Sequence, residues 1–206
     1  MKVYGNHINV GTRAVLIMCA EKGHAPEFHS IDILTGEHQT PAYLAVHPEG
    51  KVPVFDTGST KLSDVGDILE YLDRELSGPR LHPPAGGGRS TEEHFMALAH
   101  SRLAPEAAKL MRELVERRLR GQEPNEDVIE SAVKEIAPLL DEAEAALASR
   151  EYFGGSSLGL VDVYWMACIS VLMDTQKESL VRSRPQLSAW WDRTSARPSW
   201  QTTKQR

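Results

Sequence analysis

The side chains that could carry out chemistry are sparse in this sequence, and they form no metal-binding or redox motif. Cys19 and Cys168 each lie inside an apolar helical pattern, which predicts buried, reduced thiols rather than a disulfide framework. His94 and His100 are six residues apart, so one helix would not present both on the same face as metal ligands. The sequence contains no HExxH, no paired CxxC and no phosphate-binding loop. We therefore expect no metal and no redox role for the cysteines.

Asp162 is the acidic residue that most needs an explanation, because it stands inside the apolar stretch 158–171. A buried carboxylate is costly unless hydrogen-bond donors surround it. We expect Asp162 to be structural and to accept hydrogen bonds from backbone N–H groups at the start of a buried helix. The basic run RRLR at 117–120 is interpreted as a solvated helix face.

The composition narrows the class of protein. With 206 residues, the chain can form one large domain or two small ones. Hydrophobic residues make up 41% and charged residues 25%, which argues against disorder, collagen and coiled coil. A net charge of −6 argues against a nucleic-acid partner. The sequence has no apolar run of about 18 residues and no signal-peptide core, so we expect a cytoplasmic protein without a membrane partner.

Hydrophobic periodicity indicates the elements that must position any site in the first 76 residues. The order of elements is βαβαββα, which describes a compact mixed α/β domain over residues 1–76. The expected strands are 2–5, 28–33, 52–55 and 60–62, and the expected helices are 12–22, 40–46 and 64–76.

A change of composition separates this domain from the rest of the chain. Residues 77–90 hold three prolines and four glycines, which is typical of a linker. Residues 91–206 show no convincing strand and form an all-helical second domain. The expected helices are 91–121 with a bend at Pro105, 126–150, 160–174 and 185–196.

Four features of the sequence occur in the order found in one enzyme family. GKVPV at 50–54 looks like a G-x-V-P segment whose proline follows a cis peptide bond, and GEH precedes it at 36–38. Residues 153–162 open an apolar helix, and RPQLSAWW and ARPSW follow at 184–191 and 196–200. Together they resemble the cytosolic glutathione transferases of the phi (plant-type) class. The resemblance covers nearly the whole chain and implies a thioredoxin-like α/β domain with a mixed four-stranded sheet, followed by an all-α domain.

The resemblance implies a site for glutathione, an anionic tripeptide with a thiol. The cysteine backbone of glutathione would pair with the N–H and C=O of Val52, next to Pro53, as an added strand. The glycyl carboxylate would lie near His38, Gln39 and Lys51, where an ammonium group suits an exposed carboxylate. Glutathione is therefore the expected co-substrate.

The γ-glutamyl end of glutathione meets an acid and a serine in the family, at the start of the third helix. This sequence has Asp64 and Val65 there. Asp64 can bind the ammonium group, and the helix N-terminus can bind the carboxylate. Val65 keeps its backbone N–H but has no hydroxyl, and one lost hydrogen bond to a charged group costs roughly 1.5–3 kcal/mol. We expect weak glutathione binding unless Ser63 or Asp67 compensates.

The thiol of glutathione needs a hydrogen-bond donor, because a free thiol has a pKa near 8.5. The phi and theta classes use a serine in the loop after the first strand, and Asn9 stands at that position here. The Asn9 amide can donate to a thiolate, although it cannot act as a base. Thr12 is the second candidate donor. Tyr4 is too early to match the tyrosine-type classes and is interpreted as strand core.

The resemblance implies transfer of the glutathione thiolate to a small hydrophobic electrophile. The electrophile would bind between the two domains, and Ile8, Val10, Met96 and Leu103 are the side chains expected to contact it. The family also implies a homodimer in which the first domain of one subunit contacts the second domain of the other. Two alternatives stay open: a glutathione-dependent disulfide reductase or peroxidase of the same fold, and a non-catalytic ligand-binding or interaction protein.

Overall fold

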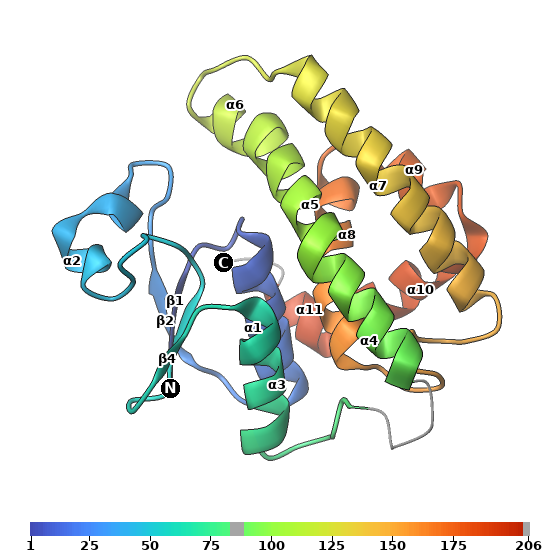
Figure 1. Cartoon of the computed structure of the whole chain (residues 1–206), viewed down its shortest axis with the longest axis horizontal. Helices are drawn as coiled ribbons and strands as arrows, with labels where there is room; N and C mark the ends of the chain where they lie inside the picture. The colour runs from blue at the N-terminus through green and yellow to red at the C-terminus, as the bar shows by residue number, and fades with distance from the viewer. Residues whose placement is uncertain (83–88, 204–206) are drawn as a thin grey trace.

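The computed structural model describes residues 1–82 and 89–203 of the chain. An α/β domain lies beside a larger, all-helical domain (Figure 1). This arrangement confirms the predicted fold class, a four-stranded mixed sheet with helices followed by a helical half. Residues 83–88 of the predicted linker lie outside the described residues. Within the described ranges, no helix is long and apolar enough to cross a membrane.

Four short strands form the sheet: β1 (Lys2–Gly5), β2 (Glu27–Ser30), β3 (Val54–Asp56) and β4 (Lys61–Leu62). Their order is β2-β1-β3-β4, with β1 parallel to β2 and antiparallel to β3, and β3 antiparallel to β4. The prediction extended β2 to residue 33, which is wrong. The strand ends earlier because the Asp32 carboxylate accepts hydrogen bonds from the N–H groups of Leu34 and Thr35, which turns the chain.

Three helices accompany the sheet: α1 (Val10–Glu21), α2 (Pro41–Leu44) and α3 (Val65–Glu75), with a 3-10 turn, η1 (Glu37–Gln39), before α2. α1 and α3 pack together between the sheet and the helical domain, whereas α2 lies at the far side of the α/β domain (Figure 1). α1 begins two residues earlier than predicted because Asn9 caps it: Asn9 Oδ1 accepts a hydrogen bond of 2.9 Å from the N–H of Thr12. The first turns of α1 and α3 both line a cavity between the α/β domain and the helical domain.

The predicted helix 91–121 is a chain of consecutive helical segments, which we call the long helix: α4 (Arg89–Leu98), η2 (Ala99–Leu103), α5 (Ala104–Met111), η3 (Arg112–Glu116) and α6 (Arg117–Leu119). η2 and η3 are wide π-helical turns. Pro105 lies in the first turn of α5, directly after η2. Proline lacks the N–H of a regular helical hydrogen bond, and a wider turn accommodates that loss.

The remaining helices are α7 (Glu126–Leu147), α8 (Leu160–Asp174), α9 (Glu178–Arg182), α10 (Pro185–Ser195) and α11 (Pro198–Thr203). α8 has the predicted bounds and is buried along nearly its whole length, so it forms the centre of the core. The sequence pattern did not indicate α9 and α11, because five or six residues are too few to show a helical period. α11 packs against α1 and so joins the end of the chain to the α/β domain.

A buried ion pair fixes the direction in which the chain leaves the α/β domain. Lys22 Nζ lies 3.0 Å from Asp73 Oδ1 and also donates a hydrogen bond to the carbonyl of Pro79. Asp73 Oδ1 in turn accepts a hydrogen bond from the N–H of Leu81. Burial raises the pKa of Asp73, but the hydrogen bonds from Leu81 and Lys22 outweigh burial and hold that pKa below its usual value. The ends of α1 and α3 are thereby joined to the segment that leads to the long helix.

Candidate functional site

An interdomain cleft of about 680 Å³ lies between the α/β domain and the long helix. We use the term cleft for this cavity alone. Six of the nine side chains predicted to form the site line it: Asn9, His38, Lys51, Val52, Pro53 and Val65. Thr12, Gln39 and Asp64 are not among its lining residues. The structure therefore brings together residues that are up to 56 positions apart in the sequence.

Val52 lies at the edge of the cleft, just before β3. The Val52–Pro53 peptide bond is cis, as the resemblance implied. Among the described residues, neither the N–H nor the C=O of Val52 has a hydrogen-bond partner. The preceding peptide is fixed, because Tyr43 Oη donates a hydrogen bond of 2.7 Å to the carbonyl of Lys51. Val52 thus presents an unpaired backbone edge to which an extended peptide can add.

The Asn9 side chain is held by Thr12 in a way that leaves its amide NH₂ group available at the cleft. Its Oδ1 atom accepts hydrogen bonds from the N–H and the hydroxyl of Thr12, at 2.9 and 3.2 Å. Because both donors face the amide oxygen, the amide nitrogen must point the other way. Within the described residues, that nitrogen has no hydrogen-bond partner. Thr12 itself is fully buried, and its hydroxyl accepts a hydrogen bond from the N–H of Asn6, so it cannot reach the cleft.

The loop residues predicted to bind the glycyl carboxylate do not all face the cleft. His38 lines the cleft, and its Nδ1 atom is buried without a partner among the described residues. Lys51 also lines it, with Nζ 2.5 Å from the carboxylate of Glu49 at an exposed position. Gln39 lies against Gly50 instead, where an added Cβ would be 2.5 Å from Gln39 Nε2. Gln39 thus supports the turn at Gly50, which has a positive φ of 64°.

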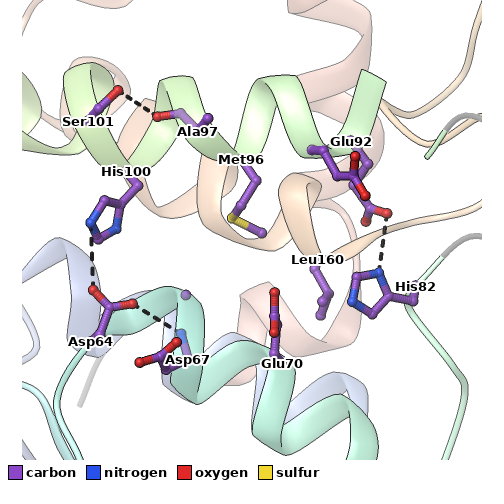
Figure 2. Close-up of a pocket in the computed structure, with 12 residues that line it drawn as sticks. Asp64, Asp67, Glu70, His82, Glu92, Met96, Ala97, His100, Ser101 and Leu160 are labelled. Atoms are coloured by element: carbon purple, nitrogen blue, oxygen red, sulfur yellow. Dashed lines mark hydrogen bonds and ion pairs between the residues drawn. The ribbon is translucent and has the colours of Figure 1, made fainter. Parts of the chain in front are cut away.

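Asp64 and Val65 lie on different sides of the start of α3. Asp64 caps the helix, because its Oδ1 atom accepts a hydrogen bond of 3.1 Å from the N–H of Asp67. Its other oxygen lies 3.6 Å from His100 Nε2 (Figure 2). Val65 lines the cleft, and its methyl group packs so closely that a Cβ added to Gly11 would lie 2.8 Å away. Val65 therefore presents a methyl group, and not a hydroxyl, to the cleft.

The wall formed by the long helix holds side chains that the sequence analysis did not assign to the site. They recur every four residues, namely His100, Ala104, Ala108, Arg112, Glu116 and Arg120. In a regular α-helix, each step of four residues advances by about 40°, so five steps would turn Arg120 about 200° away from His100. The π-turns η2 and η3 hold more residues per turn and keep these side chains on one face. Arg120 is exposed, as the interpretation of 117–120 as a solvated face implies, and it also donates a hydrogen bond of 3.0 Å to the carbonyl of Ile33.

Of the four side chains predicted to line an interdomain pocket for the second substrate, Ile8, Val10, Met96 and Leu103, only Val10 lines the cleft. Val10 lines the cleft, next to Asn9. Leu103 is 1% exposed and belongs to the core, and Ile8 packs against the core outside the cleft lining. Met96 faces a different cavity. Tyr164 reaches the cleft from α8, and no signal in the sequence distinguished it from its buried neighbours.

The second cavity, which we call the acidic cavity, encloses about 500 Å³ between α3 and α4 (Figure 2). Among the described residues, its lining includes no lysine or arginine and has five carboxylates: Asp64, Asp67, Glu70, Glu92 and Glu93. Glu92 is 3% exposed, and neither of its oxygens has a hydrogen-bond partner among the described residues. His82 Nδ1 lies 3.5 Å from Glu92 Oε2. Burial raises the pKa of Glu92, although His82 opposes that shift.

Asp162 lies at the start of α8, close behind the acidic cavity, and its structural role is confirmed. Its Oδ2 atom accepts a hydrogen bond of 2.8 Å from the N–H of Gly159. Its Oδ1 atom accepts from the N–H of Phe153 at 3.2 Å and from Nε1 of Trp190 at 2.7 Å. Complete burial raises the pKa of Asp162 to about 7 in spite of these donors. Asp162 therefore joins three segments of the helical domain and does not face the cleft.

Comparisons with known proteins cover both domains. Models of the glutathione S-transferase N-terminal and C-terminal domains match residues 10–80 and 93–198. A glutathione S-transferase of Silene vulgaris is 34% identical over 208 residues, with 98% of this chain and 96% of the relative covered. Glutathione S-transferase F9 of Arabidopsis thaliana is 30% identical over 206 residues, with 98% and 95% covered. The crystal structure of glutathione transferase F7 from Populus trichocarpa has a TM-score of 0.90 at 27% identity, with 98% and 97% covered. The chain therefore belongs to the glutathione S-transferase family and is similar to its phi-class members.

Proposed function

We propose that this glutathione transferase activates the thiol of its co-substrate through the amide of Asn9. The observation that carries the proposal is the amide nitrogen of Asn9, which is oriented by Thr12 and left without a partner at the wall of the cleft. A hydrogen bond to the thiolate lowers the thiol pKa, so more of the bound glutathione is ionised at neutral pH. The thiolate then attacks an electrophilic carbon: a C–S bond forms, and the leaving group departs with its electron pair.

The rest of the proposed site holds glutathione in an extended form. The backbone of Val52 pairs with the cysteine of glutathione, and His38 and Lys51 bind the glycyl carboxylate. At the other end, the N–H of Val65 at the start of α3 binds the γ-glutamyl carboxylate, while Asp64 caps that helix from the side of the acidic cavity. Thr12 and Gln39 act indirectly in this proposal. Thr12 orients Asn9, and Gln39 supports the turn before Lys51.

The thiol must come from glutathione, because neither cysteine of the chain is suited to be a nucleophile. Cys19 and Cys168 are both buried. Burial raises the pKa of the Cys19 thiol to about 12 and raises that of Cys168 further still. A disulfide reductase that works through its own thiolate is therefore not supported, and conjugation to a small hydrophobic electrophile is the reaction that we propose.

We further propose a cytoplasmic, detoxifying homodimer. Residues 1–76 would form the glutathione-binding domain, 77–90 the linker and 91–206 the helical domain, and the first domain of one subunit would contact the second domain of the other. The family resemblance supports this arrangement. Size-exclusion chromatography with light scattering tests the dimer directly, since a mass near 23 kDa rather than twice that value contradicts it.

The experiment that tests the proposed function measures the thiol itself. Absorbance near 240 nm reports glutathione thiolate, and we expect its pH midpoint to fall below 8.5 when glutathione is bound to the protein. Formation of the conjugate with 1-chloro-2,4-dinitrobenzene is measured in parallel. A protein that neither shifts the midpoint nor forms the conjugate contradicts the proposal and supports the non-catalytic alternative.

A further inference from the structure

We propose that the physiological electrophile carries an anionic group, such as a carboxylate, and that Arg112 of the long helix selects it with the help of Arg120. The inference rests on the proposed function, because it concerns the second substrate of the same cleft. It adds a substrate class and a specificity-determining residue, neither of which follows from the binding of glutathione.

The charges on the helical wall carry the proposal. Arg112 and Arg120 both line the cleft from the long helix, and Glu116 lies between them in the sequence. The wall therefore keeps a net positive charge apart from Lys51 and His38, which our proposal assigns to glutathione. Arg120 is partly engaged, since it donates to the carbonyl of Ile33. Arg112 is exposed, and its guanidinium makes no hydrogen bond or ion pair with any described residue.

The backbone geometry gives an independent reason to infer that the fold positions Arg112 at the cleft. The π-turn η3 begins at Arg112, and it is one of the two wide turns that keep the four-residue steps on the cleft face. π-turns are rare and are frequently found at functional sites. A guanidinium on that face presents a planar fork of donors, which matches the two oxygens of a carboxylate.

The small side chains of the wall leave room for the carbon skeleton of such a molecule. Ala104, Pro105 and Ala108 precede Arg112 on the same face, and Tyr164 adds an aromatic surface. Eight residues of helix separate Ala104 from Arg112, a rise of about 12 Å. An aromatic ring with a carboxylate at one end therefore fits along the wall, with its apolar part on the alanines and its charge at Arg112.

A positive group at this place also has a clear role in the reaction. The nucleophile is an anion, so an electrophile that carries its own negative charge is repelled as it approaches. A guanidinium beside the carboxylate compensates that charge without touching the reacting carbon. Arg112 is accordingly a specificity residue rather than a catalytic one.

Two matched electrophiles test the proposal: 4-chloro-3,5-dinitrobenzoate and its neutral methyl ester. In both, the thiolate attacks the ring carbon that bears chlorine, the C–S bond forms and chloride leaves with the electron pair. Each kcat/KM is divided by the rate constant of free glutathione thiolate with the same compound. We expect the wild-type protein to favour the benzoate, and we expect Arg112→Gln to lower the benzoate-to-ester ratio about tenfold, mainly through KM.

Arg118→Gln is the matched control, because Arg118 is exposed on the same helix but does not line the cleft. It should leave the ratio within about twofold of wild type, and Arg112→Lys should restore part of it because the charge returns without the fork. Equal effects of Arg112→Gln and Arg118→Gln overturn the inference, as does a wild-type protein that turns over the ester but shows no preference for the benzoate. If the wild-type protein conjugates neither compound and leaves the thiol midpoint unshifted, the proposed function fails as well.

Discussion

The cleft and the acidic cavity lie along the same long helix, yet their charges are opposite. In the part of the chain that the structure describes, the cleft is lined by Lys51, Arg112 and Arg120 and by a single carboxylate. The acidic cavity there has five carboxylates and no lysine or arginine. His100 lines both. A chain with a net charge of −6 can therefore offer a positive site to an anionic peptide, because the fold separates its charges onto different faces.

The two regions also differ in how their polar groups are satisfied. In the cleft, neither the Asn9 amide nitrogen nor the Val52 backbone has a hydrogen-bond partner among the described residues, so both are available to a ligand. At the acidic cavity, the carboxylate of Glu92 is buried without a hydrogen-bond partner among the described residues, and behind the cavity Asp162 is buried with both oxygens bonded. Substitutions in the cleft should therefore change binding and rate, and substitutions behind the acidic cavity should change the free energy of unfolding.

The largest effect is expected from Asp162→Ala. The change leaves the N–H groups of Gly159 and Phe153 and Nε1 of Trp190 without an acceptor, and each buried, unsatisfied donor costs roughly 1–3 kcal/mol. We expect the free energy of unfolding in urea to fall by about 3 kcal/mol or more. Asp162→Asn keeps one acceptor oxygen and should lose less. Turnover per folded molecule should be unchanged, and an unchanged urea midpoint with lost turnover would contradict the difference between the two regions.

Asn9→Ala should give the largest effect on rate. It removes the donor to the thiolate, so the pKa of bound glutathione should rise and turnover should fall roughly ten- to a hundredfold. The variant also loses the cap of α1, which lowers stability. Asn9→Asp is the control that separates the two roles, because its carboxylate still accepts from Thr12 but has no N–H to donate. Asn9→Ser should keep much of the activity.

The thiolate absorbance of bound glutathione across pH decides between these roles. If Asn9→Asp and Asn9→Ala both raise the midpoint while only Asn9→Ala lowers stability, Asn9 is both cap and donor. If neither raises it, Asn9 only caps α1, and a backbone N–H beside it becomes the donor to examine.

Val65→Ser should tighten glutathione binding by about tenfold, since a hydroxyl at the start of α3 can donate to the γ-glutamyl carboxylate. Titration calorimetry measures the change. Val65→Ala is the control, because it also relieves the close packing of the Val65 methyl group against Gly11 but adds no donor. Equal affinities for the serine and alanine variants would show that another group, such as Ser63 in the cleft, already binds the carboxylate.

In the cleft, sequence reasoning located those residues whose position depends on one short segment of the chain. The resemblance of residues 50–54 to a G-x-V-P segment implied the cis bond before Pro53, and alignment of the segment after β1 with the phi-class pattern pointed to Asn9. The bounds of α8 followed from a strongly apolar stretch. These features depend on local sequence, so a pattern of a few residues is sufficient to find them.

The helical wall of the cleft could not be predicted in the same way. A period of 3.6 residues places Arg120 far from His100, and only the π-turns bring them to one face. Asp64 shows a similar limit, because the capping pattern at the start of α3 indicated its position but not that its side chain faces the acidic cavity. Side chains of this kind are placed by tertiary contacts rather than by periodicity.

The smallest effect is expected from Glu92→Gln and depends on pH. Burial raises the pKa of Glu92, so the folded protein holds a proton at pH values where the unfolded chain has lost it. The contribution of Glu92 to the free energy of unfolding is therefore complete below the unfolded pKa of about 4.3 and is lost as the pH rises through the higher folded value. Glutamine stays neutral, so the stability of Glu92→Gln relative to wild type should rise as the pH increases above the unfolded pKa of about 4.3. Urea unfolding at several pH values measures this difference, and Glu93→Gln is the control because Glu93 is 65% exposed and pairs with Arg89. A difference that stays constant with pH would mean that His82 keeps the carboxylate ionised, which would contradict the direction of the pKa shift.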